Sequence, residues 1–313
     1  MIWILWVVLG LIASYLLSVV VIGFIVYSIL LLRTSKQKWA RKPSIPGDEE
    51  YMRLYEDGMR WREENLSFKK DVAINSCGYA LKGEYFDFGF RRAVIVIPGR
   101  MESCYYCCHY AAPFKAAGWN VLTIDDRAHG LSEGIVNSLG YKEYRDIIAW
   151  AKMLHDDLGN TQVLLHGVCI GSSAALFAMT SGDCPPYMVG MIADGMYQRF
   201  LDSFNKHMVE DKHPKPPLVY PMIMLYVRLI SGADVTNDGP FYRIDRLKKP
   251  VLFLHSREDS YSIPEKAQQL FDKCTAPKKV VWFEKGAHSR VRIKNPQAYD
   301  EAVIAYLAET YGA

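Results

Sequence analysis

The chain has 313 residues, of which 50% are hydrophobic and 23% charged, and this balance excludes a disordered or low-complexity protein. Its length suits one large domain or two modest ones with a sizeable buried core. The net charge of +3 carries no clustered basic excess of the kind that nucleic-acid binding needs, so we expect no nucleic-acid partner.

Residues 1–32 contain no Asp, Glu, Lys, Arg or His and predict a single membrane-spanning helix. As a helix they reach roughly 48 Å, more than the roughly 30 Å hydrocarbon layer. A cleaved secretory signal would instead need a basic start and a shorter apolar run. Basic residues follow the apolar run at Arg33, Lys36, Lys38, Arg41 and Lys42. Because positive flanks stay on the cytoplasmic side, we expect a single-pass membrane protein whose catalytic domain is cytoplasmic.

The rest of the chain divides into a basic juxtamembrane segment with a linker helix at 33–66 and an α/β domain at 67–313. In this domain apolar strands alternate with helices, which predicts a mostly parallel sheet with helices on both faces. The expected strands cover 72–77, 79–88, 93–97, 120–125, 162–166, 188–194, 251–255 and 280–284, and the expected helices lie near 103–117, 141–157 and 264–274 and begin near 171 and 296. An insertion at about 196–247 is too long for a simple connection and predicts a helical cap.

The seven cysteines are an odd number without paired spacing, which indicates free thiols in a reducing compartment. Cys104, Cys107 and Cys108 share one predicted helical face with His109 nearby. No second pair of ligands accompanies them, so we expect apolar core there rather than a metal or redox site. The chain also lacks G-x-G-x-x-G and P-loop motifs, and no cofactor is predicted.

Gly167, Cys169 and Gly171 form a G-x-C-x-G sequence directly after a predicted strand and before a predicted helix. This is the context in which G-x-S-x-G makes a nucleophile elbow, a strained turn that exposes its central residue. A helix N-terminus favours the thiolate, so Cys169 is the candidate nucleophile. The alternative is a structural cysteine in a glycine-rich turn.

The acid and the base of such a site follow the nucleophile at the ends of later strands. Asp259 follows the strand at 251–255, and His288 follows the strand at 280–284. We therefore expect His288 as general base and then acid, with Asp259 fixing its tautomer. Glu258 is a neighbour of Asp259, and Asp194, at the end of another strand, is the alternative acid.

Two backbone N–H groups are needed to bind the oxyanion that forms during acyl transfer. One is expected from Ile170, the residue after the nucleophile. The second is expected from Arg100, in the loop that follows the strand at 93–97.

The segment DDRAHGLSEG at 125–134 resembles D-x-R-G-H-G-x-S-x-G of α/β hydrolases of the serine aminopeptidase and monoglyceride-lipase type. GVCIGSSAAL resembles their elbow, and the likeness runs from about residue 67 to 313, closest to bacterial members with one N-terminal membrane helix. It implies an α/β-hydrolase fold, triad positions at Cys169, Asp259 and His288, and an oxyanion region at Gly99, Arg100 and Ile170. The chain departs from that family in having Cys for Ser and Pro98-Gly99 for His-Gly.

The expected function is that of a membrane-anchored acyl hydrolase that cleaves an ester, thioester or amide through an acyl-enzyme. Its substrate would be a small-molecule or lipid-like acyl compound. Two alternatives remain: an acyltransferase with the same cysteine, and a non-catalytic pseudoenzyme that binds a lipid or a partner. The sequence predicts neither the substrate nor the oligomeric state.

Overall fold

The computed structural model describes residues 2–210 and 218–312 and contains one sheet of eight strands. The strand order is β1-β2-β4-β3-β5-β6-β7-β8, and only the pairs β1·β2 and β2·β4 are antiparallel. The strands are β1 (Lys69–Ser76), β2 (Tyr79–Phe86), β3 (Arg92–Ile97), β4 (Asn120–Ile124), β5 (Gln162–Val168), β6 (Met188–Asp194), β7 (Val251–Ser256) and β8 (Lys278–Phe283). The predicted mostly parallel sheet is confirmed.

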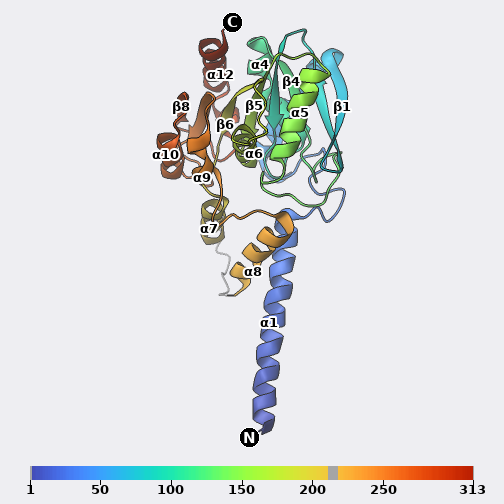
Figure 1. Cartoon of the computed structure of the whole chain (residues 1–313), viewed down its shortest axis with the longest axis vertical. Coiled ribbons are helices and arrows are strands. Elements are labelled where there is room, and N and C mark those ends of the chain that lie inside the picture. The colour runs from blue at the N-terminus through green and yellow to red at the C-terminus, as the bar shows by residue number, and fades with distance from the viewer. Residues whose placement is uncertain (1, 211–217, 313) are drawn as a thin grey trace.

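Helices cover both faces of the sheet (Figure 1). On one face lie α5 (Tyr144–Asp156), α6 (Ile170–Met179) and α10 (Pro264–Lys273), and on the other α3 (Cys104–Cys107), α4 (Ala112–Ala116) and α12 (Pro296–Tyr311). The remaining α-helices are α1 (Ile2–Leu31), α2 (Glu49–Glu64), α7 (Phe200–Glu210), α8 (Val219–Tyr226), α9 (Pro240–Arg243) and α11 (Val291–Lys294). Short 3-10 helices are η1 (Leu66–Phe68), η2 (Cys108–Tyr110) and η4 (Ile244–Arg246), and η3 (Val227–Ser231) is a π-helix that follows α8 directly.

The predicted helix near 103–117 is wrong in one respect, because it is broken into α3, η2 and α4. Pro113 lies in the first turn of α4, where its missing N–H costs nothing, and it cannot continue a helix from the preceding turn. Cys104, Cys107 and Cys108 are all buried in this segment. Within the part of the chain that the structure describes, no three His, Cys, Asp or Glu side chains are grouped to hold a metal.

Helix α1 is long and apolar enough to cross a membrane, and it extends away from the domain (Figure 1). Its buried residues form one stripe: Val19, Gly23, Tyr27 and Leu31. This stripe packs on α8 and η3, where a side chain at Gly23 would meet Met222. The Tyr27 hydroxyl lies 3.0 Å from that of Ser231. The C-terminal half of α1 is therefore part of the fold and not a loose tether.

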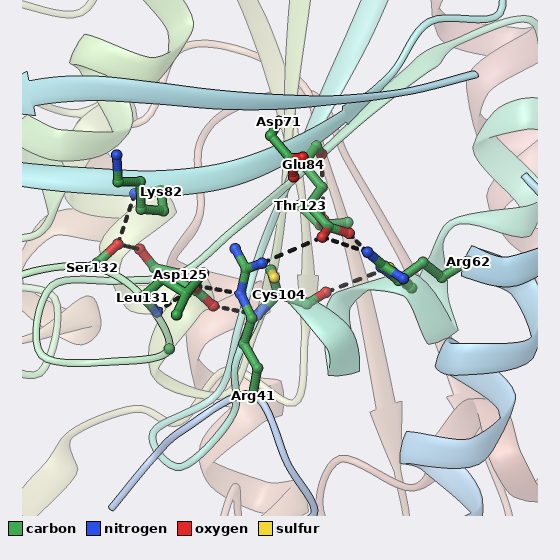
Figure 2. Close-up of polar contacts among 12 residues, drawn as sticks. Arg41, Arg62, Asp71, Lys82, Glu84, Cys104, Thr123, Asp125, Leu131 and Ser132 are labelled. Carbon is green, nitrogen blue, oxygen red and sulfur yellow. Dashed lines mark hydrogen bonds and ion pairs between the residues drawn. The ribbon is translucent and has the colours of Figure 1, made fainter. Parts of the chain in front are cut away.

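The juxtamembrane segment is held to the domain by buried charges (Figure 2). Arg41 Nε lies 2.8 Å from Asp125 Oδ2, and its Nη1 lies 3.3 Å from Glu84 Oε1. Arg62 of α2 binds the same Glu84 carboxylate from the other side, at 2.6 and 2.8 Å. Since Glu84 and Asp125 are buried, Arg41 is an internal ion-pair partner in addition to a basic flank residue.

Replacing Arg41 by methionine is expected to lower the free energy of unfolding by about 3 kcal/mol, because buried Asp125 loses its ion-pair partner and buried Glu84 keeps only one of its two arginine partners, Arg62. The adjacent Lys42 is exposed and contacts Gln37, so Lys42→Met is expected to change it by less than about 0.5 kcal/mol. Denaturation of both detergent-solubilised variants measures the difference. Equal stability of the two would show that the buried pairs contribute nothing.

Candidate active site

Cys169 occupies a strained turn between β5 and α6, with φ 55° and ψ −115°. A positive φ is rare for a residue with a side chain and is kept here by the surrounding contacts. A Cβ at Gly171 would lie 2.7 Å from the Pro98 carbonyl oxygen and still closer to that of Ile97. A Cβ at Gly167 would collide with the backbone at Gly171. Both glycines are thus required for the elbow that the sequence predicts.

Gly171→Ala is expected to lower the free energy of unfolding by about 3 kcal/mol, because the carbonyl groups that it meets belong to the rigid β3 end. Gly182 is a matched control, since nothing lies within 4 Å of the position of its Cβ. Gly182→Ala should therefore leave stability within about 0.5 kcal/mol of the wild type. Denaturation curves of the two variants decide the point, and a tolerated alanine at 171 would contradict the steric argument.

His288 and Asp259 are joined by a hydrogen bond of 2.8 Å between Nδ1 and Oδ2. The other carboxylate oxygen of Asp259 accepts the backbone N–H groups of Tyr261 and Ser262, at 2.8 and 2.7 Å. Burial alone would raise the pKa of Asp259, but the charge and hydrogen bond of His288 and the Ser262 N–H outweigh it and lower the pKa. Asp259 is therefore ionised, and it fixes the orientation of the imidazole.

His288 also interacts with Cys169. Burial lowers the pKa of His288, but the charges of Asp259 and Cys169 outweigh that effect and leave the pKa well above its usual value. The raised pKa means that the imidazole readily holds a proton, and its buried Nε2 atom has no hydrogen-bond partner among the described residues. The Tyr261 ring stacks on the imidazole with centroids 5.0 Å apart. The imidazole is thus held between its carboxylate and the cavity that Cys169 lines.

The other two candidate acids do not contact His288. Asp194 Oδ2 accepts the Tyr299 hydroxyl at 2.7 Å, and burial raises the pKa of Asp194 to about 7. Its backbone oxygen accepts the N–H of Cys169 at 2.9 Å, so Asp194 supports the elbow through its main chain. Glu258 accepts the backbone N–H of Gly286 at 2.9 Å. Of the three acids, only Asp259 is hydrogen-bonded to the imidazole.

The predicted oxyanion donors lie beside the nucleophile. Arg100 and Ile170 line the same cavity as Cys169 and His288. Their backbone N–H groups donate no hydrogen bond within the described ranges of the chain, which leaves them available to a substrate oxygen. The Arg100 side chain is bound to α1, because its Nη1 donates a hydrogen bond of 3.0 Å to the Leu30 carbonyl in the last turn of that helix.

Two residues of this site were not predicted from the sequence. Glu102 is buried, and its carboxylate accepts the Gly99 N–H at 2.8 Å and the Tyr51 hydroxyl at 2.7 Å. Burial raises the pKa of Glu102. Glu102 thereby fixes the loop that carries Arg100, and Tyr51 of α2 holds Glu102 in turn. The only sequence signal for Glu102 was that an acidic residue stands three positions after Gly99, and no sequence signal pointed to Tyr51.

The cavity has a volume of about 370 Å³ and is mainly apolar and aromatic away from the reactive groups. Leu30 of α1 lines it, together with Phe200 and Phe204 of α7 and with Tyr197 and Tyr261. This size and lining suit an acyl group whose carbonyl lies at the polar end. The cavity is therefore enclosed by the edge of the sheet, the predicted cap region and the end of α1.

No family model matches this chain. It is 28% identical to the uncharacterised protein YqkD of Bacillus subtilis over 239 residues, and this match covers 75% of this chain and 78% of YqkD. Among solved structures, the Pyrococcus furiosus esterase Pf2001 superposes with a TM-score of 0.66 at 23% identity, over 80% of this chain and 94% of the esterase. An α/β hydrolase of Vibrio vulnificus gives 0.59 at 15% identity, over 79% and 85%.

Proposed function

Taking the α/β-hydrolase fold as established, we propose that this chain is a membrane-anchored acyl hydrolase with a Cys169-His288-Asp259 triad. One observation carries the proposal. His288, joined to Asp259 at 2.8 Å through Nδ1 and with its Nε2 unpartnered among the described residues, lines the same cavity as a cysteine on a strained elbow. A strained nucleophile position beside an oriented imidazole is the arrangement that covalent acyl transfer needs.

In the first half of the reaction, His288 Nε2 takes the Cys169 thiol proton as the sulfur attacks the acyl carbonyl carbon. The N–H groups of Ile170 and Arg100 stabilise the negative oxygen of the tetrahedral intermediate. When the intermediate collapses, the bond to the leaving group breaks and His288 returns the proton to that group. A thioester on Cys169 remains.

In the second half, His288 removes a proton from water, and the hydroxide attacks the thioester carbonyl carbon. The carbon–sulfur bond breaks, the acid leaves and Cys169 recovers its proton from His288. Asp259 stays ionised throughout and stabilises the imidazolium. A thioester is also a good donor to an alcohol or amine, and the thiol in place of a hydroxyl makes acyl transfer the second candidate function.

The test is turnover of a graded series of p-nitrophenyl esters and acyl thioesters by the full chain, with intact-mass detection of the acyl-enzyme. A transient mass increase equal to the acyl group, lost in Cys169→Ala, supports the mechanism. Preferential transfer to added alcohol or amine over water identifies a transferase. If no substrate is turned over and no adduct forms, the fold serves as a binding protein and the proposal fails.

The anchoring part of the proposal rests on the packing of α1. Tyr27 and Leu31 belong to the same apolar cluster as Leu139, Ile170 and Tyr197, so removal of α1 as a signal would open the domain next to the nucleophile. The basic residues after α1 favour a cytoplasmic domain. Cys77 is exposed, and a membrane-impermeant maleimide should label it in inside-out vesicles and not in intact cells. Cys77→Ser controls for the other thiols, and labelling in intact cells would reverse the orientation.

A further inference from the structure

The most exposed large apolar residues outside α1 come from two segments that both pack on the C-terminal part of α1. They are Leu229, Ile135 and Leu131, with 69%, 65% and 63% of their surface exposed. Leu225 is a further exposed leucine, on α8. We call these four residues the lateral surface. Exposed apolar residues scattered singly need no explanation, but a gathered set marks an interaction site.

Both parts of the lateral surface lie against the end of α1. Leu131 and Ile135 come from the loop that holds Arg33, whose backbone N–H donates to the Ile135 carbonyl at 2.7 Å. Arg33 Nη2 also donates to the Gly130 carbonyl at 2.7 Å. Leu225 and Leu229 come from α8 and η3, which run beside α1 at the end of the domain from which α1 extends (Figure 1).

Helix α1 is still apolar and outward-facing where these elements pack on it. Ile25 and Ile29 are exposed beside the buried positions Gly23 and Tyr27, which face α8 and η3. No charged residue occurs in α1, and the first in the chain is Arg33. Tyr226 Oη lies 3.2 Å from the Val20 carbonyl and Tyr27 Oη lies 3.0 Å from Ser231 Oγ, so Leu225 and Leu229 are at the level of this apolar part of α1 and meet the same medium. For a helix that crosses a bilayer, that medium is lipid.

Charges border this region as they do at a membrane surface. Arg228 is exposed and adjoins Leu229 in the chain, and Lys36 is exposed shortly after the end of α1. Basic groups at the headgroup level beside apolar groups that reach the acyl region are typical of proteins that lie on a bilayer.

The active-site cavity is on the same side of the molecule. Leu30, which lines it, is in the last turn of α1 and adjoins the exposed Ile29. The Arg100 guanidinium, on the loop at the cavity, donates to the Leu30 carbonyl. The cavity is thus built against the end of the membrane helix, next to the lateral surface.

We propose that the lateral surface sits in the cytoplasmic face of the bilayer and that the cavity receives the acyl chain of a lipid directly from it. The inference rests on the proposed acyl hydrolase function and narrows its substrate to an amphiphile that resides in the membrane and carries an ester or thioester. The occupant of the lateral surface is lipid, and a protein partner or a second copy of this chain is excluded by the outcomes below.

The first test is independent of activity. The full chain is reconstituted into phosphatidylcholine vesicles that contain a phosphatidylcholine with a diazirine on its acyl chain. Illumination and peptide mapping should find adducts at 131–135 and 225–229 in addition to α1. The control is exposed Leu66 in η1, directly before β1. Lys69, the first residue of β1, pairs with Phe86, and Phe86 pairs with Val121 near the start of β4. Leu66 therefore lies at the edge of the sheet opposite to the carboxyl ends of the parallel strands, and it should not be labelled. Adducts on α1 alone would overturn the proposal.

The second test compares two substrates in the same vesicles. The double variant Leu131→Asp/Leu229→Asp is expected to lose about tenfold of its rate on a long-chain ester embedded in the bilayer, because charges there oppose insertion. Its rate on a water-soluble short-chain ester should match that of the wild type. Leu66→Asp, a matched exposed leucine, should change neither rate.

An unchanged rate on the embedded ester, or an equal loss on both esters, would overturn the role of the lateral surface in lipid access. If the wild type turns over neither ester, the proposed function fails instead, and the photolabelling alone decides whether the lateral surface contacts lipid.

Discussion

Replacing Cys169 by alanine is expected to lower kcat for an acyl ester or thioester by about ten-thousand-fold, because no acyl-enzyme can then form. His288→Ala should cost about as much, and the double variant should cost little more than either single one. This lack of additivity is the expected result for two groups that act as a unit, as the interaction of His288 with Cys169 indicates.

The matched control for the nucleophile is Cys184→Ala, since Cys184 is also a half-buried free thiol but contacts Lys249 away from the cavity. It should keep wild-type kinetics. Cys169 should also react with iodoacetamide faster than the other thiols and lose that advantage in His288→Ala. A Cys169→Ala protein with full activity would remove this cysteine from the mechanism.

Asp259→Asn is the second change with a large expected effect, a loss of about a thousand- to ten-thousand-fold in kcat. The amide preserves the shape of the carboxylate, but it cannot stabilise the imidazolium and its N–H₂ group favours the wrong tautomer of His288. The loss should appear in kcat rather than in KM, because Asp259 contacts the imidazole and does not line the cavity. Steady-state kinetics on one soluble ester separates the two parameters.

Asp194→Asn provides the control for the acid. Asp194 bonds the Tyr299 hydroxyl instead of His288, and burial already raises its pKa to about 7, so a neutral amide there is a mild change. We expect a loss of less than about tenfold in kcat. A large loss in Asp194→Asn together with a small one in Asp259→Asn would reverse the assignment of the acid.

The sheet was predictable from the sequence because its central strands are buried on both faces. Runs such as AVIVI at 93–97 in β3 are continuously apolar, and turns and amphipathic helices separate them. The break between α3 and α4 was missed because a run of cysteine and tyrosine reads as helix up to Pro113. Proline ended one helix and began another, and only the start of a helix tolerates it.

The positions of Cys169, Asp259 and His288 at strand ends could be predicted because parallel strands bring their carboxyl ends to one edge. The residues that hold these three side chains and their loops in place could not be predicted. The bond from Tyr51 to Glu102 joins residues 51 positions apart, and neither belongs to a motif. Leu30 lines the cavity although it belongs to the apolar segment that the sequence assigns to the membrane. Such contacts depend on how separate segments dock, which periodicity does not encode.

The stripe of α1 that faces α8 and η3 has a practical consequence for biochemistry on this protein. A shortened protein that begins after residue 32 would lose Tyr27 and Leu31, and with them the cover over Leu139, Ile170 and Tyr197. Ile170 carries an oxyanion N–H in the proposed mechanism. Exposure of this apolar cluster would therefore make the shortened protein both poorly soluble and inactive. Purification therefore needs detergent or nanodiscs around an intact α1, and the inactivity of a fragment without α1 would not test the chemistry of Cys169.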